Sequence, residues 1–291
     1  MGSTDPRRGA GSARAVFVTL LVASTACSAA PTQPATSSPS REPFFEVLLA
    51  EQVEWGPLNP ARGDASPLAG TLWGDRGRNV PTGFLFRPVD GFSSPPHLHN
   101  VSYRGVVIRG EVHNGPPSVE PTWMPKLSFW TQPKGEVHVT AARGDDVLAY
   151  IEIDEGPYLV KPVEEEFDSG EVAVNLHEAN LVWVEAAGRE GSAEVHLAHL
   201  WRDRGTSRGR GVLVRLAVGA EVTLSVQDRA LRAVVVQGTP LVSAEGHGGE
   251  TRLAPGSAIH SGPGGTCDLR SEAEECVLYV RSEGEVFLEV R

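Results

Sequence analysis

The segment GFSSPPHLHNVSYRGVVIRG, residues 91–110, decides how this chain folds and where its chemistry lies. Two histidines, His97 and His99, stand two residues apart, shortly before a run of β-branched residues that is typical of a strand. Side chains two residues apart on a strand point to the same face, so both imidazoles can reach one metal ion. A second segment, PKGEVH at residues 133–138, ends in His138, which can supply a third imidazole from a neighbouring strand.

The sequence around residues 91–110 recurs once, 128 positions further along the chain. The match resumes after an insertion of one residue, where residues 148–151 correspond to residues 277–280. A constant offset through so many identities indicates two copies of one fold. The identical pairs include Trp55 and Trp183, Trp73 and Trp201, Gly83 and Gly211, Gly91 and Gly219, and Gly110 and Gly238.

Both copies alternate short β-branched or aromatic runs with glycine, proline and aspartate, a pattern that favours strands. The runs are residues 84–86, 106–108 and 147–153 in the first copy, and 212–214, 234–236 and 277–280 in the second. After residue 41, residues 44–53 form the only stretch considered for a helix. The pattern therefore predicts an all-β chain that repeats one sandwich or barrel in tandem.

A chain of 291 residues has room for two domains of ordinary size, and we place them at residues 42–165 and 166–291. The formal charge of −11, from 37 acidic against 26 basic residues, argues against a surface built to neutralise nucleic-acid phosphates. We therefore expect a small-molecule ligand or substrate and no nucleic-acid partner. Pairing of two chains into a homodimer stays open.

The N-terminus has the order of a signal peptide: three arginines, then an apolar run over residues 15–23, then small residues. That run is far shorter than the roughly 20 residues that span a bilayer. Ala26-Cys27 resembles a bacterial lipoprotein cleavage site, so we predict a signal peptide over residues 1–26 and lipidation of Cys27, with simple secretion after Ala26 as the alternative. Residues 27–41 are predicted to form a flexible tether. We therefore expect an exported protein of the cell envelope that contacts the membrane only through the lipid on Cys27.

The two histidine segments together resemble the motifs of the cupin superfamily. Residues 91–110 match the first motif, G-x5-H-x-H-x3-E-x6-G, except that Tyr103 stands where the glutamate is expected. Residues 133–138 match P-x-G-x2-H of the second motif, whose leading glycine is Leu127 here. The chain looks like the two-domain cupins of a domain-of-unknown-function family related to the zinc cupin of an anti-sigma factor. This resemblance implies two jelly-roll barrels of the double-stranded β-helix type.

The expected site in the first copy is one divalent transition metal, Fe, Zn, Mn or Ni, on His97, His99 and His138. The alternative is that these histidines are only polar residues at a barrel mouth. Tyr103 is a poor ligand while protonated, so we expect it to line the site. Three nearby residues, Glu111, His113 and Glu136, are interpreted as solvated surface groups.

The second copy carries other residues at these positions. His97, His99, Tyr103 and His138 correspond to Ser225, Gln227, Leu231 and Cys267, a set that predicts no metal site. Cys267 and Cys276 flank an acidic, turn-like stretch, so a disulfide and two free thiols are both open.

Two functions from different classes fit this sequence. A metal-dependent oxygenase or isomerase predicts an open coordination position beside an apolar pocket. A non-catalytic binder or sensor predicts an ion closed by four ligands with no room beside it.

Overall fold

The computed structural model describes residues 45–203, 209–227, 229–245, 248–284 and 286–291. Within these ranges the regular elements are β-strands and short 3-10 turns, which confirms the predicted all-β chain. In the described ranges no helix is long and apolar enough to cross a bilayer. The helix considered over residues 44–53 was wrong: strand β1 (Phe45–Leu48) is followed by the turn η1 (Ala50–Gln52). The signal peptide, the tether and Cys27 lie outside the described residues.

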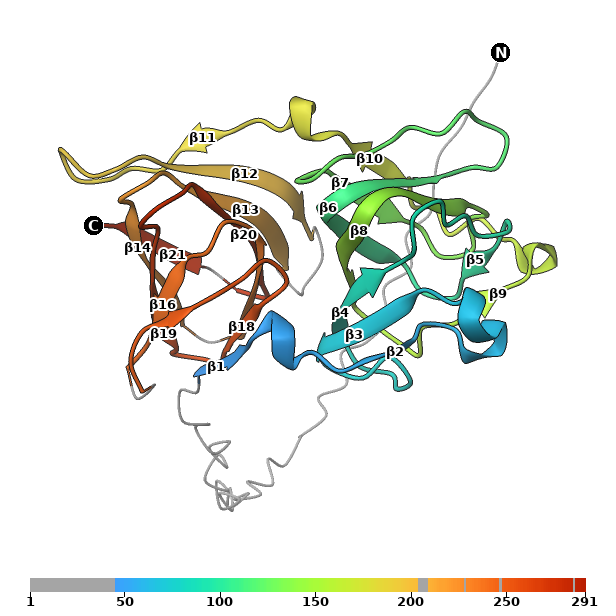
Figure 1. The fold of residues 1–291 in the computed structure, drawn as a ribbon, viewed down its shortest axis with the longest axis horizontal. Coiled ribbons are helices and arrows are strands. Elements are labelled where there is room, and N and C mark those ends of the chain that lie inside the picture. The colour runs from blue at the N-terminus through green and yellow to red at the C-terminus, as the bar shows by residue number, and fades with distance from the viewer. Residues whose placement is uncertain (1–44, 204–208, 228, 246–247, 285) are drawn as a thin grey trace, which may run out of the picture. The chain divides into compact units, whose positions relative to one another are not determined.

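The first barrel is built on a seven-stranded antiparallel sheet in the order β10-β7-β6-β8-β4-β3-β2 (Figure 1). A short pair of strands, β5 and β9, lies on the other side of this barrel. The bounds are β2 (Trp55–Pro57), β3 (Leu68–Trp73), β4 (Thr82–Arg87), β5 (Leu98–His99), β6 (Tyr103–Gly115), β7 (Phe129–Gln132), β8 (Val139–Ile153), β9 (Val160–Lys161) and β10 (Val174–Leu176); the turns are η2 (Pro60–Ala65), η3 (Val163–Glu165) and η4 (Glu178–Asn180).

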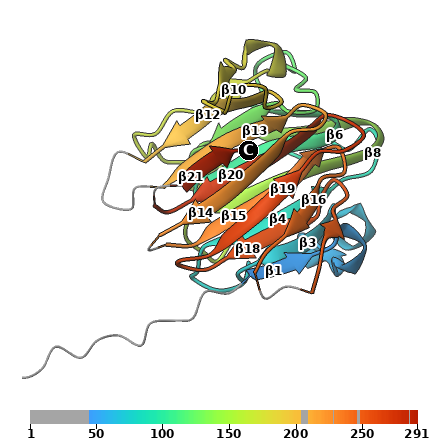
Figure 2. The same ribbon diagram turned by 90° about the vertical axis from the view of Figure 1, so that its left-hand side faces the viewer.

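The second barrel repeats the seven-stranded sheet, in the order β1-β18-β15-β20-β13-β12-β11, and adds a five-stranded sheet, β17-β16-β19-β14-β21 (Figure 2). The tandem arrangement of two β-barrels is therefore as the sequence predicted. The bounds are β11 (Val184–Glu185), β12 (Val195–Arg202), β13 (Arg210–Leu216), β14 (Glu221–Val226), β15 (Leu231–Gln237), β16 (Leu241–Ser243), β17 (Thr251–Arg252), β18 (Ala258–Ser261), β19 (Thr266–Arg270), β20 (Cys276–Ser282) and β21 (Val286–Val290).

The two copies exchange their first strands. Strand β1 pairs antiparallel with β18 of the second barrel, with Phe45 opposite Ser261. Its counterpart β10 pairs with β7 of the first barrel, with Val174 opposite Thr131. Each exchanged strand covers a sheet edge that would otherwise expose unpaired backbone groups. The domain boundary after residue 165 stays a prediction. The strand pairing shows that the sheet of each barrel includes one strand from the other side of this boundary.

Packing explains why one pair of equivalent positions, Gly83 and Gly211, is glycine in both copies. A Cβ on Gly83 would lie 2.2 Å from Trp73 Nε1, and a Cβ on Gly211 would lie 2.0 Å from Trp201 Nε1. Each indole lies against the glycine that faces it on the neighbouring strand, and each donates its N–H to a tyrosine hydroxyl. The hydrogen bonds are Trp73 to Tyr150 at 3.2 Å and Trp201 to Tyr279 at 2.9 Å.

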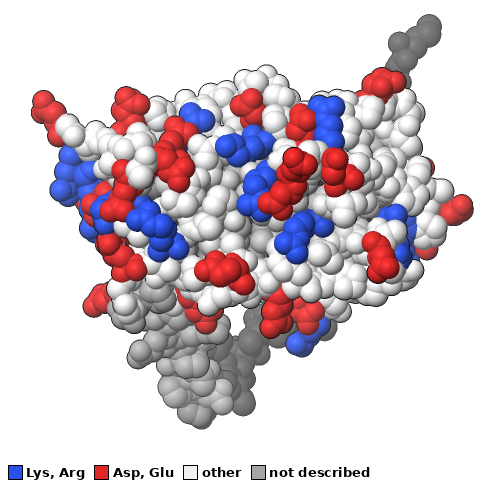
Figure 3. Space-filling view, viewed as in Figure 1, with Lys and Arg blue, Asp and Glu red and all other residues white. Residues whose placement is uncertain are grey.

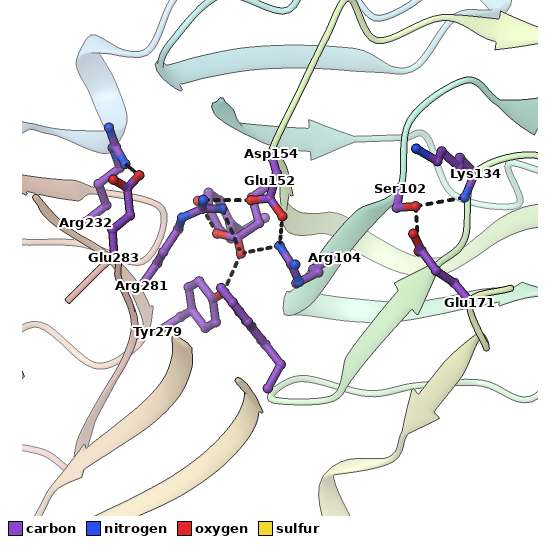
Figure 4. A network of polar contacts seen from close by, with 12 residues as sticks. Ser102, Arg104, Lys134, Glu152, Asp154, Glu171, Arg232, Tyr279, Arg281 and Glu283 are labelled. Carbon is purple, nitrogen blue, oxygen red and sulfur yellow. Dashed lines mark hydrogen bonds and ion pairs between the residues drawn. The ribbon is translucent and has the colours of Figure 1, made fainter. Parts of the chain in front are cut away.

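These two tyrosines meet at the interface between the barrels, where a charged network is buried (Figure 4). Glu152, only 1% exposed, accepts a hydrogen bond from Tyr279 at 2.8 Å and lies 3.4 Å from Arg281. Arg281 also pairs with Asp154 at 2.7 Å. Burial disfavours the guanidinium charge, yet the two carboxylates outweigh it and raise the pKa of Arg281. Glu152 and Arg281 occupy equivalent positions in the two copies, so opposite charges meet where identical ones would repel.

Arginine–indole stacking also crosses this interface in both directions. Arg104 of the first copy lies over the ring of Trp201, 3.9 Å from its centroid. Arg232, its counterpart, lies over Trp73 at 4.1 Å. The two contacts join the barrels through planar cations whose N–H edges still pair with carboxylates, Arg104 with Asp154 and Arg232 with Glu283. On the outer face seen in Figure 3, basic and acidic side chains are interspersed and no large area carries one sign.

Candidate metal centre

Backbone pairing brings the three predicted histidines together. The His97 N–H donates to the His138 carbonyl at 3.0 Å, and the His138 N–H returns a bond to the His97 carbonyl at 2.9 Å. His99 follows in β5 on the same side. One ring nitrogen from each histidine lies within 4.8 Å of those of the other two. The sequence spacing therefore produces the convergence that one ion requires.

Each imidazole is oriented by a backbone carbonyl. Carbonyl oxygens only accept hydrogen bonds, so each contacted Nδ1 must carry the proton and each Nε2 is unprotonated, with a lone pair that can accept a hydrogen bond or bind a metal. Such outer hydrogen bonds are typical of histidines that ligate metals. The acceptors are Pro95 for His97 at 2.9 Å, Leu159 for His99 at 3.1 Å and Glu136 for His138 at 3.2 Å.

Burial keeps these rings neutral. It lowers the pKa of His138 to about 3 and holds the pKa of His99 well below its ordinary value, and neighbouring imidazoles add to both effects. The pKa of His97 is lowered for the same main reason, burial. A divalent ion needs neutral imidazoles, so these ligands are ready to bind at neutral pH.

Tyr103 lies beside the cluster, where the cupin motif has glutamate. Its hydroxyl donates to Asn114 Oδ1 at 2.9 Å and lies 3.3 Å from His138 Nε2. Burial raises the pKa of this phenol, which keeps it protonated. Among the described residues the cluster holds three imidazoles and no carboxylate. An ion bound here would therefore keep its full positive charge.

The direction of the Tyr103 hydrogen bond follows from its neighbours. Gln132 donates its amide N–H group to the backbone carbonyl of Glu136 at 3.2 Å, which makes its Oε1 an acceptor. Asn114 must then donate to that oxygen, at 2.7 Å, and its own Oδ1 receives the Tyr103 proton. The Tyr103 oxygen and His138 Nε2 are thus two acceptors facing each other. A cation at the cluster would relieve this contact, so the residues present fit a metal ion.

Sequence reasoning missed Tyr158. Its ring stacks on His99, with centroids 4.4 Å apart and planes 18° from parallel, and its hydroxyl lies 3.1 Å from His99 Nε2. The residue follows β8 and stands 59 positions from His99 in a stretch with no motif, so no pattern in the sequence pointed to it.

A cavity of about 280 Å³ opens beside His97 and His99, and Tyr103 is among the residues that line it. Its walls are mostly apolar, and Arg62 is the one residue among its lining with a full charge. The remaining lining residues are Leu58, Asn59, Pro67, Phe86, Phe92, Ser94, Pro95, Trp130, Thr140, Ile151, Tyr158 and Val160.

Of the three other candidates, Glu136 is half-buried and contacts the cluster through its backbone carbonyl, whereas Glu111 and His113 are not among the clustered ligands. Glu111 forms an ion pair with Arg143 at the surface, as a solvated role predicts. His113 is buried, 3% exposed, with its Nδ1 beside Thr122, so the prediction of an exposed side chain was wrong. Gly110 suggested that the strand ends in a turn, which would leave His113 exposed. Strand β6 instead continues past Gly110, whose φ is positive, and His113 points inwards.

The described residues of the second barrel contain no comparable cluster. Ser225 stands opposite Thr266, and Leu224 opposite Cys267, in the pair of strands that corresponds to the histidine pair. Gln227 is exposed and Leu231 is buried. In the described part of the chain, the three histidines of the first barrel form the only cluster of at least three metal-ligating side chains.

The two cysteines of the second barrel are buried free thiols, so the disulfide left open by the sequence is not formed. Both belong to the apolar core of that barrel. Burial raises the pKa of the Cys267 thiol to about 12, which keeps it protonated and inert.

Solved structures with a similar fold include proteins named as dioxygenases and an oxalate decarboxylase. A candidate dioxygenase from Nostoc punctiforme superposes with a TM-score of 0.61 at 15% identity, covering 82% of each chain. Salicylate 1,2-dioxygenase from Pseudoaminobacter salicylatoxidans gives 0.55 at 14% identity, over 82% of this chain and 81% of that one. A variant of Bacillus subtilis oxalate decarboxylase gives 0.54 at 10% identity, over 83% and 78%. At these identities the likeness shows the fold alone.

Comparison by sequence gives the family. No curated protein matches the chain significantly. Residues 46–288 match the model of the family described as Domain of unknown function (DUF4437), which spans both barrels. The chain therefore belongs to the DUF4437 family and has a cupin-type β fold.

Proposed function

We propose that this chain is a metal-dependent, dioxygenase-like enzyme that acts on a small molecule. One observation carries the proposal: three neutral imidazoles, each with an unprotonated Nε2, converge beside an apolar cavity. His97, His99 and His138 would hold one divalent transition metal, with Fe, Mn, Zn and Ni as candidates. Such an ion, when bound, supplies Lewis-acid or one-electron redox chemistry.

The chain's own residues prepare the site for that chemistry. The carbonyls of Pro95, Leu159 and Glu136 fix the imidazoles, so no ligand has to reorient on binding. Tyr158 covers His99 with its ring. The apolar walls exclude water from a small molecule in the cavity, which strengthens every electrostatic contact made there.

A non-catalytic metal binder is less well supported. A structural ion is closed by four protein ligands with no room beside it. Here three histidines are the ligating groups among the described residues, and a cavity lies directly against two of them. We also propose that the chain is related to the zinc cupin of an anti-sigma factor. That relationship supports Zn²⁺ as a candidate ion but does not favour a closed, four-ligand site.

The similar structures support the reaction class by analogy. Two of the three are named as dioxygenases, and another oxalate decarboxylase structure is described by its Mn(II) centres. Export belongs to the proposal as well: the signal-peptide pattern of residues 1–26 and Cys27 support a lipid-anchored protein of the cell envelope.

The test combines metal loading with oxygen uptake. Metal-free protein is loaded in turn with Fe²⁺, Mn²⁺, Zn²⁺ and Ni²⁺, and oxygen consumption is followed with 1,3-diketones, thiols, flavonoids and hydroxybenzoates. We expect uptake with at least one combination, and none in His99→Ala. His196→Ala, a half-buried histidine of the second barrel, is the matched control. Metal that fails to bind, or uptake that persists in His99→Ala, contradicts the proposal.

A further inference from the structure

The charge of the cavity is opposite to that of the protein. The chain carries a net charge of −11, yet among the residues that the structure describes no aspartate or glutamate lines the cavity. Of these described lining residues, Arg62 alone carries a full charge. The corresponding position of the second barrel is the exposed Glu190. The arginine is therefore present only in the copy that has the histidine cluster. Its positive charge would attract an anionic ligand.

The turn η2 holds Arg62 at the edge of the cavity. Its backbone N–H bonds to the Asn59 carbonyl at 3.0 Å, and Asn59 Oδ1 accepts from the Ala61 N–H at 3.1 Å. The guanidinium lies 5.7 Å from the centroid of the Phe92 ring. Stacking uses the face of a guanidinium and leaves its N–H edge for a planar anion such as a carboxylate.

Apart from the imidazoles, the polar side chains that line the cavity either offer an N–H group or already make hydrogen bonds. The Nε1–H of Trp130 is buried and has no hydrogen-bond partner, although it lies towards the Tyr103 hydroxyl. Asn59 has its oxygen engaged, which leaves its amide N–H group. Ser94 accepts from the Thr140 N–H at 3.0 Å. Donors without acceptors favour a ligand that brings acceptors of its own.

We propose that the cavity binds a small carboxylate with an apolar body, held by Arg62 at its charged end and by the Phe86, Phe92 and Trp130 rings along its length. This inference rests on the proposed function of the same cavity and names its substrate class. An ion pair with Arg62 gives the selectivity, because a neutral analogue leaves the guanidinium without its partner.

Benzoate and its neutral analogue benzamide test the proposal on the full chain, with binding followed by calorimetry. We expect benzoate to bind at least about tenfold more tightly than benzamide, and Arg62→Gln to remove that preference. Arg87→Gln is the matched control, because Arg87 also stacks on an aromatic ring, Trp55, at 3.9 Å but lies outside the cavity. It should keep the preference. A benzoate preference that survives Arg62→Gln overturns the proposal, as does equal binding of both probes.

Repeating the titration on chelated and on metal-loaded protein separates this inference from the proposed function. Arg62→Gln should keep its metal content while losing the benzoate preference. If benzoate binding instead depends on the metal and is untouched by Arg62→Gln, the carboxylate site fails and the metal centre stands. If no metal binds and Arg62 still selects benzoate, the carboxylate site stands and the enzyme proposal fails.

Discussion

The two barrels share a scaffold and differ in what fills it. Both have the same order of seven strands, both receive an exchanged strand, and both hold a tryptophan–tyrosine hydrogen bond at the interface. The first barrel has imidazoles and a cavity, whereas the second has an apolar core that includes Leu224 and Cys267. The scaffold is maintained by packing and pairing, and the site depends on a few side chains placed on it.

The largest expected effect separates the histidines of the two barrels. His99→Ala should lose more than about a hundredfold in metal affinity, because even loss of a partner outside the ligand shell costs 10–100-fold. His196→Ala should lose none. Competition with a chelator of known affinity measures both. Equal affinities for the two variants would place the metal elsewhere.

The interface charges give the next largest effect. Glu152→Ala should destabilise the protein by about 3 kcal/mol, because the buried Arg281 loses one of its two carboxylate partners and keeps only Asp154. Making the copies alike through Arg281→Glu should be at least as harmful. Urea unfolding provides the free energies. A double change of Glu152 and Arg281 to methionine should recover most of the loss, and no recovery would mean that the pair is not coupled.

The histidine cluster should also make the metal-free protein sensitive to acid. The pKa of His138 is about 3 in the folded chain against 6.5 unfolded, so between these values the unfolded chain binds more protons. Its contribution to stability is complete above about pH 6.5 and falls as the pH drops towards 3, by up to about 1.4 kcal/mol per pH unit. Urea midpoints at pH 7 and pH 5 should differ less in His138→Gln than in the native chain. Equal pH dependence would show that the ring is solvated.

A smaller effect concerns one pair of packed residues. A Cβ on Gly105 would lie 2.2 Å from the Trp130 ring, whereas the equivalent pair in the second barrel is Ala233 opposite Ile259. Gly105→Ala should therefore cost about 1–3 kcal/mol by overpacking. Adding Trp130→Ile should recover part of that cost. Ala233→Gly, the reverse change, should cost about 1 kcal/mol through backbone entropy alone.

The sequence predicted what depends on local spacing. The repeat, the strands and the three histidines all follow from short patterns, and the fold reproduces them. Contacts between distant segments left no such pattern. Tyr158 reaches His99 from a loop, Arg62 reaches the cavity from a turn, and β1 reaches the sheet of the other barrel. These depend on how the chain closes on itself, which periodicity does not report.

The number of metal ions per chain tests the central comparison most directly. Protein purified from its own host compartment is analysed by mass spectrometry for bound transition metals against protein concentration. One ion per chain, lost when His97 and His99 are both replaced by alanine while the second barrel stays folded, is the predicted result. Two ions per chain, or an ion that remains in that double variant, would contradict a site confined to the histidines of the first barrel.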